Sequence, residues 1–136
     1  MITVPASDFV PFLSRVRAND LKPDGRHIRA DAFATVVLRA PVAAARIASF
    51  TVNFQTSENG PTLRSVEFRN GQGDRELVLG RKTGFARSDF TSNFQDDPVN
   101  IPPGTSVRLE VSFPGGIDTV IDPGEFILTN VLIDDG

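Results

Sequence analysis

The sequence predicts an all-β domain in which two antiparallel sheets pack face to face, with a jelly roll as the first choice and an immunoglobulin-like sandwich as the alternative. Turn-forming pairs of Pro, Gly and Asn recur at short intervals, and the segments between them have the length and alternating polarity of strands. Residues 7–17 have apolar side chains at helical spacing, but Pro11 interrupts them and leaves a helical turn or an extended arm. Roughly seven to nine apolar strands need two sheets, because a single sheet would leave an apolar face in water.

The first predicted strands follow from apolar patterning. Residues 32–40 form a strand that is apolar on both faces at its centre, as in a strand covered from two sides. Residues 48–55 alternate apolar and polar side chains, and residues 62–69 have a shorter apolar face. The Asn59-Gly60 turn lies between these two strands, so we predict that they pair as a hairpin.

The strand at residues 106–113 has the clearest alternation in the chain. Shorter strands are predicted at residues 75–79, 99–101 and 117–121, and a last strand at residues 125–133 is apolar on both faces. The predicted core consists of the apolar residues on the inward faces of the clearest strands: Phe50, Val52, Phe54, Val66, Phe68, Val107, Leu109, Val111 and Phe113.

Length and composition exclude several classes of protein. The 136 residues form one predicted domain, residues 1–136, since domains cluster at roughly 100 to 150 residues. Hydrophobic residues make up 40% of the chain, which is enough for a core. The chain has no Cys and one His, which excludes disulfides, thiol chemistry and zinc sites built from Cys or His clusters. We therefore expect no resident metal or cofactor.

Targeting signals are equally scarce. No segment has the basic and apolar regions of a Sec-type signal peptide, so we expect cytoplasmic synthesis without export by that route. No apolar segment approaches the roughly 18 residues that span a bilayer, so we expect no membrane insertion.

Charge is distributed unevenly along the chain. Residues 1–87 hold 13 of the 14 Lys and Arg residues with eight acids, whereas residues 88–136 hold only Arg108 with nine acids. Two interpretations remain open: pairing between adjacent strands of one chain, or contact between opposed patches of neighbouring subunits. The arginines are scattered and not interleaved with stacking aromatic residues, so we expect no nucleic-acid partner.

Catalytic residues are not assigned. His27 lies between Arg26 and Arg29 in a predicted polar loop, where the two cations should lower its pKa and leave it a surface residue. Because no nucleophile, base and oxyanion site can be assigned together, the chain is predicted not to be an enzyme. A glycosidase would need a carboxylate pair, and no spacing distinguishes one among the candidates Glu67, Glu76, Glu110 and Glu125.

Acidic residues near the predicted turns supply the oxygen ligands that Ca²⁺ prefers. None has the spacing of an EF-hand loop, so turn formation at a solvated rim is the favoured interpretation and no metal site is assigned. The residues concerned are Asp96, Asp97, Asp118, Asp122, Asp134 and Asp135.

Residues 99–111 read Val-Asn-Ile-Pro-Pro-Gly-Thr-Ser-Val-Arg-Leu-Glu-Val, a polar turn with a Pro-Gly pair followed by a long strand. In this pattern the chain resembles small non-catalytic jelly-roll modules of the carbohydrate-binding-module kind, over about its last two thirds. The resemblance implies a jelly-roll fold and a glycan ligand. The chain departs from it in lacking Trp and Tyr, the residues that stack on sugar rings, and its 11 Phe residues are mostly at core-facing positions.

The final predicted strand motivates the main functional prediction. One face carries Phe126, Leu128 and Leu132, and the opposite face carries a second apolar set that needs its own cover. A neighbouring subunit would provide that cover, and the alternative cover is the N-terminal segment, residues 9–13. The predicted interface residues are Ile127, Val131 and Ile133.

The main prediction is accordingly a non-enzymatic jelly-roll subunit that forms a homo-oligomer, a trimer, with a structural, surface or adhesion role. The first alternative is a carbohydrate-binding module, which in a lectin-like form would depend on calcium. The second alternative is a glycan-active enzyme with a carboxylate pair.

Overall fold

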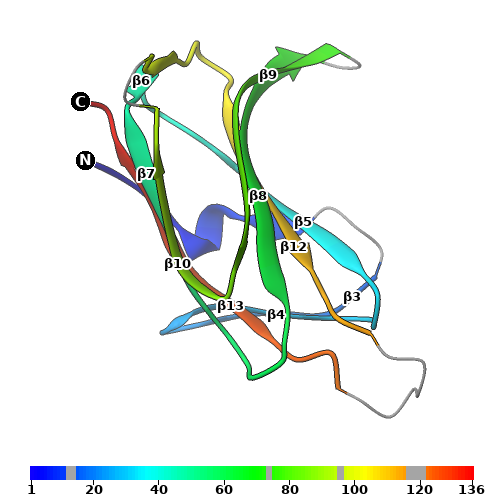
Figure 1. Ribbon diagram of the computed structural model, residues 1–136. Coiled ribbons are helices and arrows are strands. Elements are labelled where there is room, and N and C mark those ends of the chain that lie inside the picture. The colour runs from blue at the N-terminus through cyan, green and yellow to red at the C-terminus, as the bar shows by residue number, and fades with distance from the viewer. Residues whose placement is uncertain (12–14, 73–74, 95–96, 116–121) are drawn as a thin grey trace.

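The computed structural model describes residues 1–11, 15–72, 75–94, 97–115 and 122–136 and, of residues 72, 75 and 76, the backbone alone. Its strands form two antiparallel sheets packed face to face, so the predicted all-β sandwich of jelly-roll type is confirmed (Figure 1). The six-stranded sheet, here the β13 sheet, has β1 (Ile2–Pro5) beside β13 and the order β10 (Ser88–Asn93), β7 (Ser49–Thr56), β13 (Phe126–Asp134), β4 (Gly25–Ala30) and β3 (Val16–Lys22).

The five-stranded sheet, here the β12 sheet, has the order β2 (Val10–Pro11), β5 (Thr35–Pro41), β12 (Ser106–Ser112), β8 (Thr62–Gln72) and β9 (Arg75–Ala86). Two short strands, β6 (Arg46–Ile47) and β11 (Val99–Asn100), pair with each other, and η1 (Ala6–Asp8) is a short 3₁₀ turn. Among the described residues there is no helix with the length and apolarity needed to cross a lipid bilayer.

The core lies between the two sheets. All nine residues predicted for it are buried, with exposed fractions of 2% or less, so this prediction is confirmed. Phe50 of β7 meets Phe68 of β8 edge to face, with ring centroids 5.5 Å apart, and thereby joins the two layers. Phe54 of β7 stacks on Phe126 of β13 at 5.0 Å within the β13 sheet.

The predicted hairpin between residues 48–55 and 62–69 is wrong. β7 pairs with β10 and β13, whereas β8 pairs with β12 and β9 in the opposite sheet. The turn between them is well formed, with the N–H of Gly60 donating to the carbonyl of Ser57 at 2.8 Å and a positive φ of 56° at Asn59. This turn connects a strand of one sheet to a strand of the other. Local turn chemistry does not determine whether the two strands lie in the same sheet or in different sheets.

Several strands differ from their predicted extent. The pattern does not predict β3, β4 or β10, and β3 in particular has mostly exposed residues without an apolar face. β9 is longer than the predicted strand at residues 75–79, and residues 99–101 contribute only β11. The strand predicted at residues 117–121 lies outside the described residues.

A β-bulge in β13 changes which side chains face the core. The register with β7 advances from Leu128 to Asn130 and leaves Thr129 unpaired. One extra residue inverts the alternation, so Val131 and Ile133 lie in the core at 0% exposed, together with Phe126 and Leu128. The alternation predicted for this strand is therefore wrong beyond Leu128.

The two alternative covers for this strand can now be compared with the structure. Val131 and Ile133 are enclosed by their own chain, and only Ile127 of the predicted interface set is half-buried on the outer side. β1 pairs with β13, and Phe9 is fully buried in the core. The N-terminal segment thus contributes to the cover, and the observation that required a second subunit no longer holds.

Two neighbouring substitutions test the register of β13. Ile133→Ala should lower the free energy of unfolding by about 2 to 5 kcal/mol, because it removes a fully buried side chain and leaves a cavity. Leu132→Ala, at a half-buried outer position, should lower it by clearly less. Urea unfolding followed by circular dichroism measures both, and the opposite order would contradict the bulge.

Candidate functional site

The outer face of the β12 sheet carries a group of charged side chains that come from four strands. Alternation along β12 turns Val107, Leu109 and Val111 into the core, so Arg108 and Glu110 point outward. The outward side chains of the neighbouring strands add four further arginines. We call this surface the arginine face, defined by Arg39, Arg64, Arg69, Arg81 and Arg108.

A row of four side chains crosses the arginine face in direct register. Arg39 of β5 is opposite Arg108 of β12, Arg108 is opposite Glu67 of β8, and Glu67 is opposite Arg81 of β9. Neighbouring strands lie about 4.8 Å apart, so the row spans roughly 14 Å. Four segments that are distant in sequence therefore present their charges along one line.

Glu67 is the anionic centre of this row. Its side chain is buried, with 5% of the residue exposed, and its two carboxylate oxygens form ion pairs with different arginines. Arg69 Nε donates to Oε2 at 2.5 Å, and Arg81 Nε lies 3.3 Å from Oε1. Glu67 thus fixes two guanidinium groups on the surface of the sheet.

The other end of the row places two like charges side by side. Arg39 Nε donates to Ser106 Oγ at 3.0 Å, which orients it along β12. Within the described residues Arg108 has no hydrogen-bond or ion-pair partner, although it lies directly opposite Arg39. Like charges at directly opposed positions of a sheet are destabilising, so this arrangement opposes folding.

A pocket of about 300 Å³ lies beside the row. Arg81 is a member of the row and also lines this pocket. Its wall includes Phe85, an aromatic residue that is 77% exposed, and Arg64, whose guanidinium carbon lies 4.4 Å from the centre of the Phe85 ring. Ser65 donates to Glu110 at 3.4 Å on the opposite wall. The pocket therefore combines an apolar ring with charged and hydroxyl groups.

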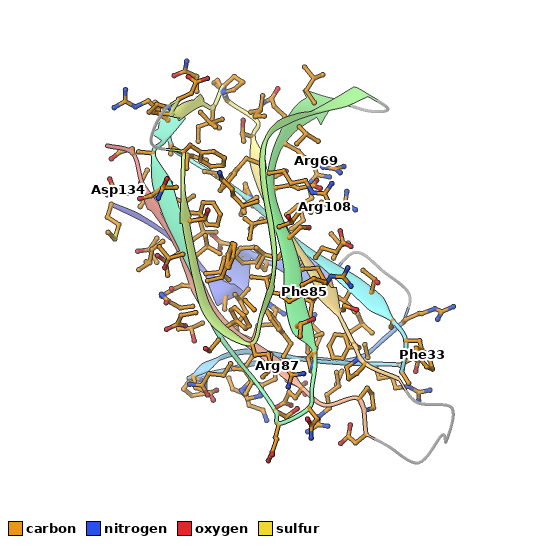
Figure 2. All side chains as sticks on the ribbon, in the orientation of Figure 1. Phe33, Arg69, Phe85, Arg87, Arg108 and Asp134 are labelled. Carbon is orange, nitrogen blue, oxygen red and sulfur yellow. The ribbon has the colours of Figure 1, made fainter. Side chains whose placement is uncertain are left out.

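Figure 2 shows how these groups lie on the ribbon. Arg69 and Arg108 project from the same side of the β12 sheet. Phe85 lies lower along the β8–β9 hairpin, in agreement with its position near the end of β9.

The predicted surface-loop position of His27 and the predicted lowering of its pKa are both wrong. His27 lies on β4 and is 8% exposed, with Nε2 2.7 Å from Asp24 and Nδ1 3.1 Å from Glu125. The hydrogen bond with Asp24 raises the pKa of His27 above its ordinary value of 6.5, Glu125 adds to the rise, and burial opposes it. Both ring nitrogens lie within hydrogen-bond distance of a carboxylate, an arrangement that favours the protonated ring.

The His27 cluster includes ion pairs between the basic and the acidic parts of the chain. Arg29 Nε donates a hydrogen bond to Glu125 Oε2 at 3.1 Å, and Arg29 Nη1 donates to Asp122 Oδ2 at 3.3 Å. The backbone N–H of Gly124 and the nearby Arg29 lower the pKa of Asp122. Basic residues of the first part of the chain thus pair with acids of the last third within one molecule.

The remaining predicted candidates are dispersed. Glu67 and Glu110 lie on the arginine face and Glu125 beside His27, whereas the side chain of Glu76 lies outside the described residues. Of the acidic turn residues, Asp96 and Asp118 are outside them as well, and Asp97, Asp122, Asp134 and Asp135 are exposed. No three His, Cys, Asp or Glu side chains in the described ranges are grouped closely enough to hold a metal ion.

Comparison with solved structures identifies the fold. A CBM4 structure matches with a TM-score of 0.54 at 13% identity, covering 96% of both chains. The family 32 module of C. perfringens NanJ, solved with galactose, matches at 0.50 and 14%, covering 95% of this chain and 96% of that one. A family two carbohydrate esterase from Cellvibrio japonicus matches at 0.48 and 12%, and this chain spans 33% of its length. No protein-family model and no curated protein matches the sequence.

These comparisons confirm the resemblance to carbohydrate-binding modules at the level of the fold. The main functional prediction, a structural or adhesion subunit that forms a trimer, is wrong. The two solved structures that match with TM-scores of 0.54 and 0.50 are both carbohydrate-binding modules. Val131 and Ile133, from which assembly was predicted, lie in the core.

Neither the arginine face nor Phe85 is predicted from the sequence. The phenylalanines are predicted mostly for the core, yet Phe85 and Phe33 are 77% and 67% exposed. The sequence does contain a signal for Phe85. Its neighbours Gly84 and Ala86 are small, and in a strand they face the side opposite to Phe85, so one of the two faces must carry the large ring. The charge row had no local signal, since its residues come from four different strands.

The His27 cluster predicts a dependence of stability on pH. A raised folded-state pKa means that the stabilisation is complete below the unfolded pKa, about 6.5, and is lost as the pH rises through the folded value. The difference in melting temperature between wild type and His27→Gln should therefore shrink as the pH is raised from about 5.5 to 8.5. A difference that stays constant or grows over this range would contradict the ion pairs.

Two substitutions in the charge row compare a charge that forms ion pairs, that of Glu67, with one that forms none among the described residues, that of Arg108. Glu67→Gln leaves two arginines without their carboxylate and should lower the free energy of unfolding by about 1 to 3 kcal/mol, reduced toward the lower end by the exposure of Arg81. Arg108→Gln removes no ion pair and should stay within about 0.5 kcal/mol of wild type or rise above it. Denaturant unfolding of both variants tests this, and a larger loss for Arg108→Gln would contradict it.

Proposed function

We propose that this chain is a carbohydrate-binding module that holds a glycan on the arginine face of the β12 sheet. The observation that carries the proposal is the exposed ring of Phe85 at the wall of a polar pocket. An exposed aromatic ring offers an apolar platform for the C–H face of a sugar, and the surrounding groups can bind its hydroxyls.

The polar groups of the pocket suit hydroxyl recognition. Arg81 supplies donors, Glu110 supplies acceptors, and Ser65 and Thr83 supply groups that do both. Glu67 already holds Arg81 in place, so this donor is oriented before a ligand arrives. Such preorganisation lowers the entropy lost on binding.

Binding without turnover is part of the proposal. Glu67 uses both carboxylate oxygens for arginines, which leaves it poorly suited to act as the acid or base of a glycosidase. Support at the level of the fold comes from the likeness to carbohydrate-binding modules, which is an analogy and not a site match. The function assigned rests on Phe85 and its pocket.

Substitution of Phe85 tests the proposal. After a glycan panel has identified a ligand, Phe85→Ala should weaken its binding about tenfold. A ring that a sugar covers on binding contributes on the order of 1.5 kcal/mol. Phe85→Trp keeps a platform and should retain binding. Isothermal titration calorimetry measures both.

The matched control is Leu21→Ala, which shortens an apolar side chain that is 53% exposed on β3 of the opposite sheet. It should bind as wild type does. The proposal fails if no glycan on the panel binds, or if Phe85→Ala binds as tightly as the control.

A further inference from the structure

We infer that the glycan is acidic, with carboxylate or sulfate groups that bind between Arg39 and Arg108 of the arginine face. The inference rests on the proposed function and specifies its ligand class. Its structural basis is the directly opposed pair of arginines at one end of the charge row.

The charge of this surface is opposite to that of the whole chain. The chain has a formal net charge of -3, whereas the described outward side chains of β5, β8, β9 and β12 include five arginines and only two glutamates. Glu67 already pairs with two of those arginines, and Glu110 accepts a hydrogen bond from Ser65. Arg108 belongs to none of these interactions among the described residues.

Arg108 is the cation best placed to receive an external anion. It has no partner within the described residues, it is half-buried, and its neighbour across the strands is Arg39. Arg39 also lines an adjoining groove of about 450 Å³ together with Asp8 and Val10. A planar oxyanion can accept paired hydrogen bonds from a guanidinium group, and an anion between two such groups would relieve their repulsion.

The anion site and the Phe85 pocket are continuous. Arg81 belongs to the row that contains Arg108 and also lines the pocket. The next row, which includes Ser65 and Thr83, lies two residues further along the strands, or about 7 Å away. A chain of sugars seated at Phe85 can thus extend along the row and place its acidic groups at Arg108.

A glycan fits these observations better than a nucleic acid does. Single-stranded nucleic acids are bound through a basic groove with several stacking rings, whereas Phe85 is the single aromatic residue lining the described pocket. Nucleic acid is accordingly included in the test as a competing outcome.

The experiment uses ligand pairs that differ only in charge. Polygalacturonate is compared with highly methyl-esterified pectin, dextran sulfate with dextran, and single-stranded DNA is measured alongside by calorimetry. At least one acidic glycan should bind ten times more tightly than its neutral counterpart and should weaken as salt is added. The carboxylated and sulfated arms identify which oxyanion is bound, and a preference in either arm supports the inference.

The matched variants are Arg108→Gln and Arg46→Gln. Arg46 is an exposed arginine on β6 that donates to the carbonyl of Asp135, away from the β12 sheet. Arg108→Gln should lose about tenfold in affinity for the acidic glycan and most of the preference over the neutral one, while Arg46→Gln retains both. Circular dichroism melts check that each variant is folded.

The outcomes distinguish this inference from the proposed function. Equal binding of acidic and neutral glycans, still dependent on Phe85, overturns the acidic ligand and leaves the carbohydrate-binding function standing. Single-stranded DNA that binds more tightly than every glycan overturns the inference in favour of a nucleic acid. If no glycan binds, both the inference and the proposed function fail.

Discussion

The layer of apolar side chains shared by the two sheets is the constraint on which the rest of the structure depends. Phe50 and Phe68 join the sheets through an edge-to-face contact, and Leu109 fills the centre of β12 without exposure to water. Because side chains alternate along a strand, burial of this layer dictates which residues face outward. The arginines of β5, β8, β9 and β12 are brought together on one surface as the outward complement of that core.

The fold class and the core could be predicted because they depend on a pattern within each strand. The alternation at residues 106–113 specifies β12, and it is independent of how the strands are ordered. The placement of β7 and β8 in different sheets could not be predicted, since the Asn59-Gly60 turn reverses the chain equally well within a sheet or between sheets. The bulge at Thr129 has no residue signature, yet it moves Val131 and Ile133 into the core and removes the reason for an oligomer.

The candidate site was less predictable than the fold because it depends on register between distant segments. Arg39, Arg108, Glu67 and Arg81 align only once four strands have paired, and no spacing in the sequence records that. The surface also places like charges side by side, since Arg108 faces Arg39 while the carboxylate of Glu67 holds Arg69 and Arg81. Arg108 has no ion-pair partner among the described residues, and departures from local pairing rules are typical of functional sites.

The central claim is that one surface, the arginine face, binds the ligand. Amide chemical shifts of ¹⁵N-labelled protein, titrated with an acidic oligosaccharide such as oligogalacturonate, test it directly without any substitution. The account predicts that the perturbed amides belong to β12, β8 and the end of β9, with Arg108, Arg81 and Phe85 among them. Perturbations centred on β3 and β4 around His27, or spread evenly over both sheets, would contradict it.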